Sequence, residues 1–259
     1  MIKEHAAFPS KPHVPARTIK WDHYRELKND STIKRHLPAT MKLNKQSLFS
    51  MLSEYTSVYL KPNRGAFGVG VIKVQKMVHK KQPRFLVHEG SRQKTFYSRN
   101  QVYAFVLANM VNKDYLVQQG IDLLRWNERP FDLRLMIKKQ SDNTWLNEGF
   151  VGRVAHPKKI VTNIRSGGTA VSIDDLLAPY TNVTSKIETK KKLNLLGEQI
   201  CELLEKKYPG IQLFGVDLGL DQNLKPWIIE VNNRPEKICW KCMLDLYKKS
   251  SESSHFIFH

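Results

Sequence analysis

The sequence contains only three cysteines among its 259 residues, and it has no long apolar run. Three cysteines are too few for a disulfide scaffold, and they favour a reducing compartment. No apolar stretch approaches the roughly 20 residues that a membrane span requires. Residues 1–17 lack the apolar core of a signal peptide and are interrupted by Pro9, Pro12 and Pro15. We therefore expect a cytoplasmic protein without a membrane partner.

Acidic residues are scarce relative to basic ones: 24 Asp and Glu stand against 42 Lys and Arg, a formal net charge of +18. Such an excess attracts anions, from nucleic acid to phosphorylated small molecules. A nucleic-acid arm would concentrate the basic residues, whereas here they are dispersed in short clusters such as Lys190–Lys192. We expect an anionic small-molecule or peptide substrate, and we do not expect a nucleic-acid partner.

Two of the cysteines, Cys239 and Cys242, form a CxxC motif near the end of the chain. A zinc site would need a second pair, and the third cysteine, Cys201, falls in a predicted helix. A redox role and ordinary helix packing both stay open for this motif, and packing is the simpler interpretation.

The most informative stretch runs from 214 to 235, where two strand-like runs flank a polar turn. If this hairpin folds about residues 223 and 224, Asp217 lies opposite Glu230, and alternation places Asn232 on the same face as Glu230. Buried on the opposite face we expect Phe214, Val216, Leu218, Trp227, Ile229 and Val231. Two carboxylates and an amide oxygen suit Mg²⁺, which takes further ligands from a substrate's phosphates. A solvated strand face is the alternative.

A glycine-rich loop lies between two predicted strands earlier in the chain. On the first of these strands, alternation places Val58 and Leu60 on one face and Tyr59 and Lys61 on the other. Gly65, Gly68 and Gly70 follow Lys61, and backbone N–H groups in such a loop can point at phosphate oxygens. A P-loop would need Lys-Ser or Lys-Thr after its last glycine, and a Rossmann loop should open a helix. Here a strand resumes at Val71. The pattern predicts a hairpin flap over a triphosphate with a lysine at its base, and an ordinary hairpin is the alternative.

Charged residues also fall in predicted strands in the middle of the chain. Asp132 and Arg134 share one face of a strand, and Arg153 lies on the next strand. Because an unpaired buried charge is expensive, these residues either form ion pairs between strands or bind phosphate oxygens. The loop 162–169 follows, in which Asn163 and two glycines allow close backbone approach to a ligand.

Hydrophobic periodicity predicts the other elements. Strands are expected at 85–88, 115–118, 131–137 and 148–154. Helices are expected within 21–37, at 40–55 with Asn44 as N-cap, and at 99–111, 190–207 and 238–247. An extended N-terminal segment, 1–20, and a frayed C-terminal tail complete the expected organisation.

Taken in order, these motifs resemble the ATP-grasp superfamily, and most closely the YheC/YheD-type proteins associated with Bacillus endospores. The resemblance covers residues 21–235, and it rests on Lys61 with the glycine loop and on YLVQQGI, FDLRLMI, TNIRSGG, FGVDLGL and IIEVNNRP. It implies an α+β ATP-grasp fold, in which two α+β subdomains clasp a nucleotide between antiparallel sheets. The expected segments are a reduced N-terminal lead-in (1–40), a first subdomain with the flap (41–117), a second with the metal site (118–240) and a tail (241–259).

The resemblance also implies roles for the residues that match the motifs, with ATP and Mg²⁺ as cofactors and Mn²⁺ as an alternative metal. Nucleotide-binding positions are Lys61, Gly65, Gly68 and Gly70 at the phosphates, and Gln118, Gln119 and Ile121 at the adenine. Residues near the transferred group are Arg134, Arg153 and Asn163, with the Gly167–Gly168 turn. Metal ligands are Asp217, Glu230 and Asn232, with Glu230 placed to bridge two ions.

Two departures accompany the resemblance. Gln119 stands where an acid is common, which alters the polar contact expected at the adenine edge, and residues 1–40 show no βαβ pattern of an acceptor-binding domain. The leading hypothesis is an ADP-forming ligase that activates a carboxylate as an acyl phosphate and joins it to an amine. The second is an ATP-binding structural protein associated with spore coat components, with reduced or no catalysis. The third is polyanion binding through net charge alone.

Overall fold

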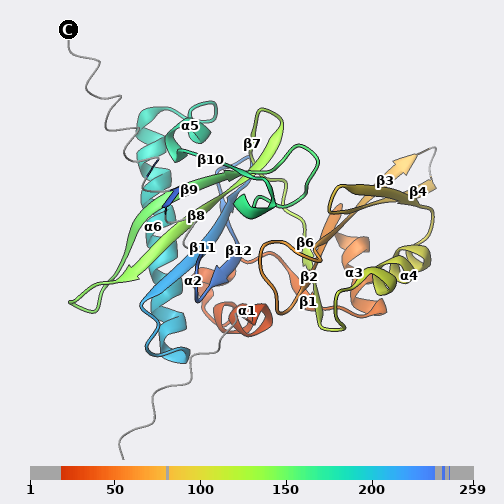
Figure 1. The fold of residues 1–259 in the computed structure, drawn as a ribbon, viewed down its shortest axis with the longest axis horizontal. Coiled ribbons are helices and arrows are strands. Elements are labelled where there is room, and N and C mark those ends of the chain that lie inside the picture. Colours follow the sequence, from red (N-terminus) through yellow and green to blue (C-terminus); the bar gives the residue numbers. More distant parts are fainter. Residues whose placement is uncertain (1–18, 80–81, 237–240, 243–244, 246–259) are drawn as a thin grey trace, which may run out of the picture.

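The structure is a computed structural model that describes residues 19–79, 82–236, 241–242 and 245 (Figure 1). The expected N-terminal segment up to residue 18, the C-terminal tail, Cys239 and most of the helix expected at 238–247 lie outside the described residues. The described chain forms two antiparallel sheets, and each sheet packs on helices through its own hydrophobic core. This confirms the predicted α+β class.

The first sheet has the strand order β1-β6-β2-β3-β4-β5. Its strands are β1 (Thr40–Lys42), β2 (Ser57–Pro62), β3 (Ile72–His79), β4 (Gln82–Glu89), β5 (Arg92–Phe96) and β6 (Tyr115–Gln119). Helices α3 (Lys45–Glu54) and α4 (Arg99–Asn109) supply Leu48, Leu52, Val102 and Val106 to the core against this sheet. Strand β6 of this sheet continues to Gln119, two residues past the expected end of the first subdomain at residue 117. The subdomain boundaries themselves stay a prediction.

Strand β2 shows the alternation that the sequence predicted. Val58 and Leu60 are fully buried in the first core, so Tyr59 and Lys61 point to the opposite face. Because α3 and α4 cover only the face of Val58 and Leu60, the two other side chains are left facing the second sheet.

The second sheet has the order β10-β9-β8-β11-β12, with β7 paired to β8. Its strands are β7 (Arg125–Trp126), β8 (Arg129–Lys139), β9 (Trp145–Val154), β10 (Thr169–Val171), β11 (Leu213–Leu220) and β12 (Pro226–Asn232). The long helix α6 (Val183–Lys207) runs along this sheet in Figure 1 and packs on it through Leu193, Leu196 and Ile200. Short helices complete this half of the molecule: α1 (Lys20–Lys28), α2 (Ser31–Lys34), η1 (Ile164–Ser166) and α5 (Ile173–Leu177).

Helix α3 begins where the sequence predicted its cap. The Asn44 side chain accepts from the Ser47 N–H at 2.8 Å, and Ser47 Oγ accepts from the Asn44 N–H at 2.9 Å, which is a reciprocal capping box. Within the stretch 40–55 that was expected to be helical, residues 40–42, ahead of the Asn44 cap, instead form β1. These residues pair with β6, with Thr40 opposite Gln118. A partner so distant in sequence leaves no local pattern.

The hairpin of β11 and β12 places Asp217 directly opposite Glu230, as predicted. The register then shifts, because Leu218 pairs with Ile228, so Ile229 is the extra residue of a β-bulge. The expectation that Ile229 is buried in the core was therefore wrong: the bulge sends Ile228 into the core and leaves Ile229 beside Glu230.

Trp227 was also expected in this core, but it is only partly buried. Its Nε1–H donates to Asp221 Oδ2 at 2.8 Å, and the Lys225 ammonium lies 3.7 Å from its ring centroid. The polar groups of the hairpin turn therefore hold this side chain at the surface. Elsewhere in the described part of the chain, no helix combines the length and the apolar character needed to cross a membrane.

Candidate active site

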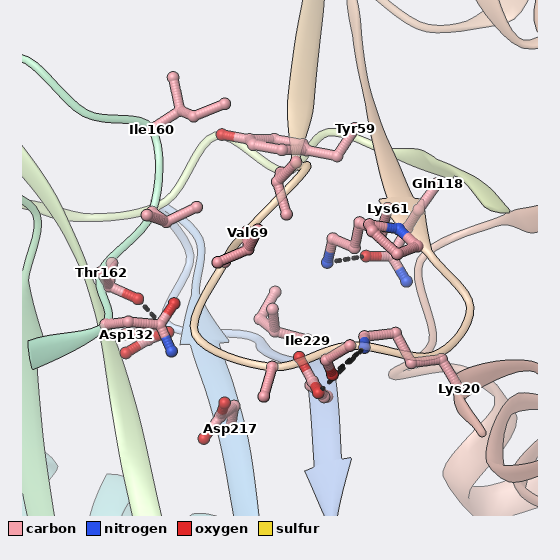
Figure 2. A pocket seen from close by; sticks show the side chains of 18 of the residues that line it. Lys20, Tyr59, Lys61, Val69, Gln118, Asp132, Ile160, Thr162, Asp217 and Ile229 are labelled. Carbon is pink, nitrogen blue, oxygen red and sulfur yellow. Dashed lines mark hydrogen bonds and ion pairs between the residues drawn. The ribbon is translucent and has the colours of Figure 1, made fainter. Parts of the chain in front are cut away.

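A pocket with about 870 Å³ of empty space opens between the two sheets (Figure 2). Strand β2 and the glycine-rich flap form one side of it, and strands β8, β9, β11 and β12 with the loop 160–163 form the other. Of the residues that the sequence singled out, the pocket is lined by Lys61, Gly65, Gly68, Gln118, Gln119, Ile121, Asp132, Arg153, Asn163, Asp217 and Glu230. Gly70, Arg134 and Asn232 are not among the described residues that line it. Ligand sites are common in such clefts between two halves of a protein.

The two ends of the pocket differ in chemistry. Tyr59 and Ile160 lie at one end in Figure 2, Val69 lies near the middle, and Asp217 and Lys20 lie at the other end. Burial raises the pKa of Tyr59 to about 12, so its ring stays neutral at physiological pH. The pocket therefore offers an apolar slot for a flat group and a charged region for an anion.

Lys61 projects from β2 into the middle of the pocket (Figure 2). Its Nζ donates to Gln118 Oε1 at 2.6 Å, and Gln118 Nε2 donates in turn to Thr40 Oγ1 at 3.1 Å. Burial lowers the pKa of Lys61 to about 8, and the nearby Lys20 ammonium adds to this, whereas the Glu230 carboxylate opposes it. A half-buried ammonium of this kind gains from an anionic partner.

The flap needs glycine at two of its three positions. Gly68 and Gly70 both have φ of +73°, the left-handed region that favours glycine. A Cβ at Gly68 would lie 2.9 Å from Val161 Cγ1, and a Cβ at Gly70 would lie 2.6 Å from Tyr115 Oη. The first glycine, Gly65, has no such requirement.

A second loop, 155–168, closes against the flap from the opposite sheet. Ser166 Oγ donates to the Phe67 carbonyl at 2.8 Å, and the Arg165 guanidinium lies 4.8 Å from the Phe67 ring centroid. Asn163 lines the pocket, and its carbonyl accepts the Gly168 N–H at 3.1 Å. The pocket is thus covered by two segments that touch each other.

A buried network of ion pairs lies beneath the charged end. Arg153 donates to both oxygens of Asp132 at 2.7 Å, and its Nη2 lies 2.9 Å from Asp217 Oδ2. Arg134 also binds both oxygens of Asp217, and Thr162 Oγ1 donates to Asp132 at 2.6 Å. Burial would raise the pKa of the Asp217 carboxyl, but Arg134 and Arg153 hold it below its usual value.

The sequence left two interpretations open for Asp132, Arg134 and Arg153: ion pairs between strands, or binding of phosphate oxygens. The contacts in the structure favour the ion pairs. The pairs join residues that lie directly opposite on neighbouring strands, Asp132 with Arg153 and Arg134 with Asp217. The ion-pair alternative therefore describes both arginines in this structure. Arg153 also lines the pocket, whereas Arg134 is behind Asp217 and is not among the described residues that line it.

With this geometry in view, comparison with known proteins identifies the family. A family model described as YheC/D like ATP-grasp matches residues 15–254. The chain belongs to this family. The predicted resemblance is confirmed.

Two relatives come from Bacillus subtilis (strain 168). The endospore coat-associated protein YheD is 27% identical over 223 residues, which are 83% of this chain and 48% of that protein. The endospore coat-associated protein YheC is 25% identical over 224 residues, which are 83% of this chain and 59% of that protein. The chain spans about half the length of these curated relatives.

A solved structure confirms the ATP-grasp fold. The crystal structure of the VanG D-Ala:D-Ser ligase from Enterococcus faecalis aligns with a TM-score of 0.51 at 11% identity. The alignment covers 84% of this chain and 52% of that one. At this identity the likeness establishes the arrangement of the two sheets and not a shared substrate.

Within this YheC/D-like fold, two of the three predicted metal ligands meet. Asp217 and Glu230 face each other across neighbouring strands and line the same pocket. Asn232, two residues further along β12, is not among the described residues that line it. No group of three or more His, Cys, Asp and Glu side chains in the described part of the chain is placed to hold a metal ion. The two carboxylates are hard oxygen donors, and they fit one divalent cation that takes its other ligands from phosphate or water.

Gln119 lies at the end of β6, where the chain leaves the first sheet; we refer to residues 118–121 as the hinge. The Gln119 side chain makes a contact that the sequence did not predict. Its Oε1 accepts the Ala39 N–H at 3.2 Å, and its own N–H donates to the Ala39 carbonyl at 2.8 Å. The next N–H, that of Gly120, donates to the Ser57 carbonyl at 2.8 Å. The Gln119 amide oxygen therefore fastens β6 to the residue before β1, so the polar contact expected of it at the adenine edge stays a prediction.

Sequence analysis missed Lys20 and Tyr59 as pocket residues. Tyr59 could have been found, because alternation along β2 places it on the face of Lys61. Lys20 carried no signal, since it is the first residue of α1 in a chain rich in lysine. Its ammonium reaches the Gly65 carbonyl at 3.0 Å and Glu230 Oε1 at 3.4 Å, and both contacts depend on tertiary structure.

Proposed function

We propose that this protein is an ATP- and Mg²⁺-dependent, ligase-like enzyme that activates a carboxylate as an acyl phosphate and joins it to an amine, forming ADP. One observation carries the proposal. A single pocket has an apolar slot at one end, a half-buried lysine in its middle, and two facing carboxylates at the other end, with a glycine flap along one side. Membership of the ATP-grasp family and the fold shared with a D-Ala:D-Ser ligase support it.

The nucleotide fits the pocket in one orientation. The adenine would lie in the apolar slot near Tyr59 and Ile160, beside the hinge residues Gln119 and Ile121. The phosphates would then extend to Lys61, beneath the flap that carries Gly65, Gly68 and Gly70. The opposite orientation would bury the phosphate charges among apolar side chains, which is costly.

The metal would be held by Asp217 and Glu230, with Asn232 as a third oxygen donor that the family resemblance implies. When bound, Mg²⁺, or Mn²⁺ in its place, supplies positive charge that offsets the charge of the triphosphate. Arg153 lines the same region and can donate to oxygens of the transferred phosphoryl group. Arg134 is a positioning residue, because it acts on the pocket through Asp217.

The chemistry proceeds in two balanced steps. A carboxylate oxygen of the substrate attacks the γ-phosphorus, the bond to the β–γ bridging oxygen breaks, and ADP leaves. The amine then attacks the acyl carbon, inorganic phosphate leaves, and the nitrogen loses a proton as the amide forms. Positioning and preorganised charge suffice for such transfers, so the protein needs no covalent nucleophile. Asn163, on the covering loop, is placed to contact the transferred group.

The test measures ADP release from ATP and Mg²⁺ in the presence of pools of carboxylic acids and amino acids. Lys61→Ala and Glu230→Gln should each abolish turnover while circular dichroism stays that of the wild type. Lys94→Ala, an exposed lysine on the far edge strand β5, is the matched control and should retain full activity. Normal turnover in Lys61→Ala or Glu230→Gln would count decisively against the proposal.

A second candidate is a nucleotide-binding protein of the spore coat with little or no catalysis. It is favoured by one observation, namely that Asp217 is already bound by two arginines and Glu230 by Lys20. The relatives named as endospore coat-associated proteins make spore association and coat partners part of this proposal. Tight binding of a non-hydrolysable ATP analogue without ADP release from ATP would favour it. Polyanion binding would instead show steep salt dependence and no response to Lys61→Ala.

A further inference from the structure

The Lys20 ammonium lies at the Glu230 carboxylate, in the region where a divalent cation would sit. Its Nζ is 3.4 Å from Glu230 Oε1 and 3.0 Å from the Gly65 carbonyl oxygen of the flap. The Lys20 side chain is only 14% exposed. Figure 2 shows it reaching the pocket from the side of helix α1, opposite to Asp132 and Thr162.

This lysine is held in place by its backbone as well as by its side chain. The Lys20 N–H donates to the Asn63 carbonyl at 3.1 Å, and the Trp21 N–H donates to Asn63 Oδ1 at 2.9 Å. Ile19 forms a β-bridge with Arg64. The start of α1 is thus fastened to the junction between β2 and the flap, which holds the Lys20 backbone beside the pocket, and the hydrogen bond to the Gly65 carbonyl keeps its ammonium near Glu230.

A second cavity adjoins the nucleotide pocket, and Lys20, Lys61, Gln118, Ile229 and Glu230 line both. This second cavity, with about 480 Å³ of empty space, lies between α1 and β12 and is lined mainly by apolar side chains. The Lys20 ammonium and the Glu230 carboxylate therefore face each other where the two cavities adjoin.

Asp217, the carboxylate opposite Glu230, already has two arginine partners. Both oxygens of Asp217 are engaged by Arg134, and one of them also by Arg153. A carboxylate keeps some acceptor capacity beyond such bonds, so Asp217 can still share one cation with Glu230. A second divalent cation at Glu230 would have to displace Lys20 or stand against its charge at short range.

We propose that Lys20 takes the place of one divalent cation at Glu230, so that the site binds one metal ion with each nucleotide. This inference rests on the proposed function, because it concerns the same nucleotide pocket. It replaces the expectation that Glu230 bridges two ions. The fixed ammonium supplies one positive charge to the phosphates and also connects the flap to the strand that carries Glu230.

The experiment counts metal ions per bound nucleotide. The full chain is mixed with excess Mn²⁺ and the non-hydrolysable ATP analogue AMP-PNP, free ligand is removed by rapid ultrafiltration, and retained metal and nucleotide are both measured. Lys20→Met removes the charge and keeps the length of the side chain, and Lys20→Arg keeps the charge. Lys28→Met, on the exposed side of the same helix, is the matched control.

The wild type, Lys20→Arg and Lys28→Met should retain one Mn²⁺ per nucleotide, and Lys20→Met should retain twice as much. Two ions per nucleotide in the wild type would overturn the inference and leave the proposed function standing. A ratio of one in Lys20→Met would also overturn it, because Lys20 would then not exclude the second ion. Absence of nucleotide binding by the wild type would overturn both the inference and the proposed function.

Discussion

Nucleotide binding should weaken about tenfold between pH 7 and pH 9, because Lys61 loses its proton in that range. Burial between the sheets lowers the pKa of Lys61 to about 8 in the folded protein. The protonated side chain binds phosphate oxygens, and the neutral amine does not attract them. The affinity is therefore present below the folded pKa and is lost as the pH rises through it.

The magnitude follows from the fraction of protein that carries the charged form. With a pKa of about 8, the protonated fraction falls from roughly nine tenths at pH 7 to roughly one tenth at pH 9. If only that form binds the triphosphate, the apparent dissociation constant rises by the ratio of the two fractions. A lysine at its ordinary pKa of about 10.4 would remain charged, and the affinity would hardly change.

The assay is titration calorimetry with AMP-PNP and Mg²⁺ at constant ionic strength across this pH range. Lys61→Arg is the informative control, since a guanidinium stays protonated and its profile should be flat. Lys61→Met should bind weakly at every pH. A flat profile for the wild type, or an equally steep one for Lys61→Arg, would refute the assignment of this titration to Lys61.

Two further predictions concern stability and are read from urea denaturation. Arg153→Met leaves the Asp132 carboxylate buried without the guanidinium that donates two hydrogen bonds to it. The free energy of unfolding should therefore fall by about 3–5 kcal/mol. Arg92→Met on the edge strand β5 should change it little, and an equally small effect at Arg153 would contradict a structural role for the pair. Asn44→Ala removes the capping box of α3 and should cost about 1 kcal/mol. Because Asn44 lies outside the pocket, AMP-PNP affinity should not change, and a marked loss of affinity would mean that the cap also shapes the site.

Much of the fold could be predicted where local chemistry was sufficient. Alternation along β2 separated Val58 and Leu60 from Lys61, and the polar turn near residue 223 set Asp217 opposite Glu230. The N-cap of α3 could be predicted from Asn44 alone. In each case the deciding contacts join residues within one element or one hairpin, so the pattern in the sequence contains them.

Prediction failed where a distant partner decides the structure. Strand β1 exists because it pairs with β6, and the helical spacing of apolar residues within 40–55 did not indicate a strand there. The bulge at Ile229 shifts the register by one residue, which exchanged the expected places of Ile228 and Ile229. A strand pattern has a period of two, so one extra residue reverses every side chain beyond it.

The sequence by itself determined the α+β class, the family, the flap with its lysine and the facing pair of carboxylates. Only the tertiary structure decided which charges meet. The register of the second sheet paired Arg153 with Asp132 and Arg134 with Asp217, and the docking of α1 brought Lys20 to Gly65, 45 residues away. The physical reason is that the charge of a side chain is a property of the residue itself and can be read from the sequence. The partner of a buried charge depends on how the strands and helices pack, which the sequence pattern does not contain.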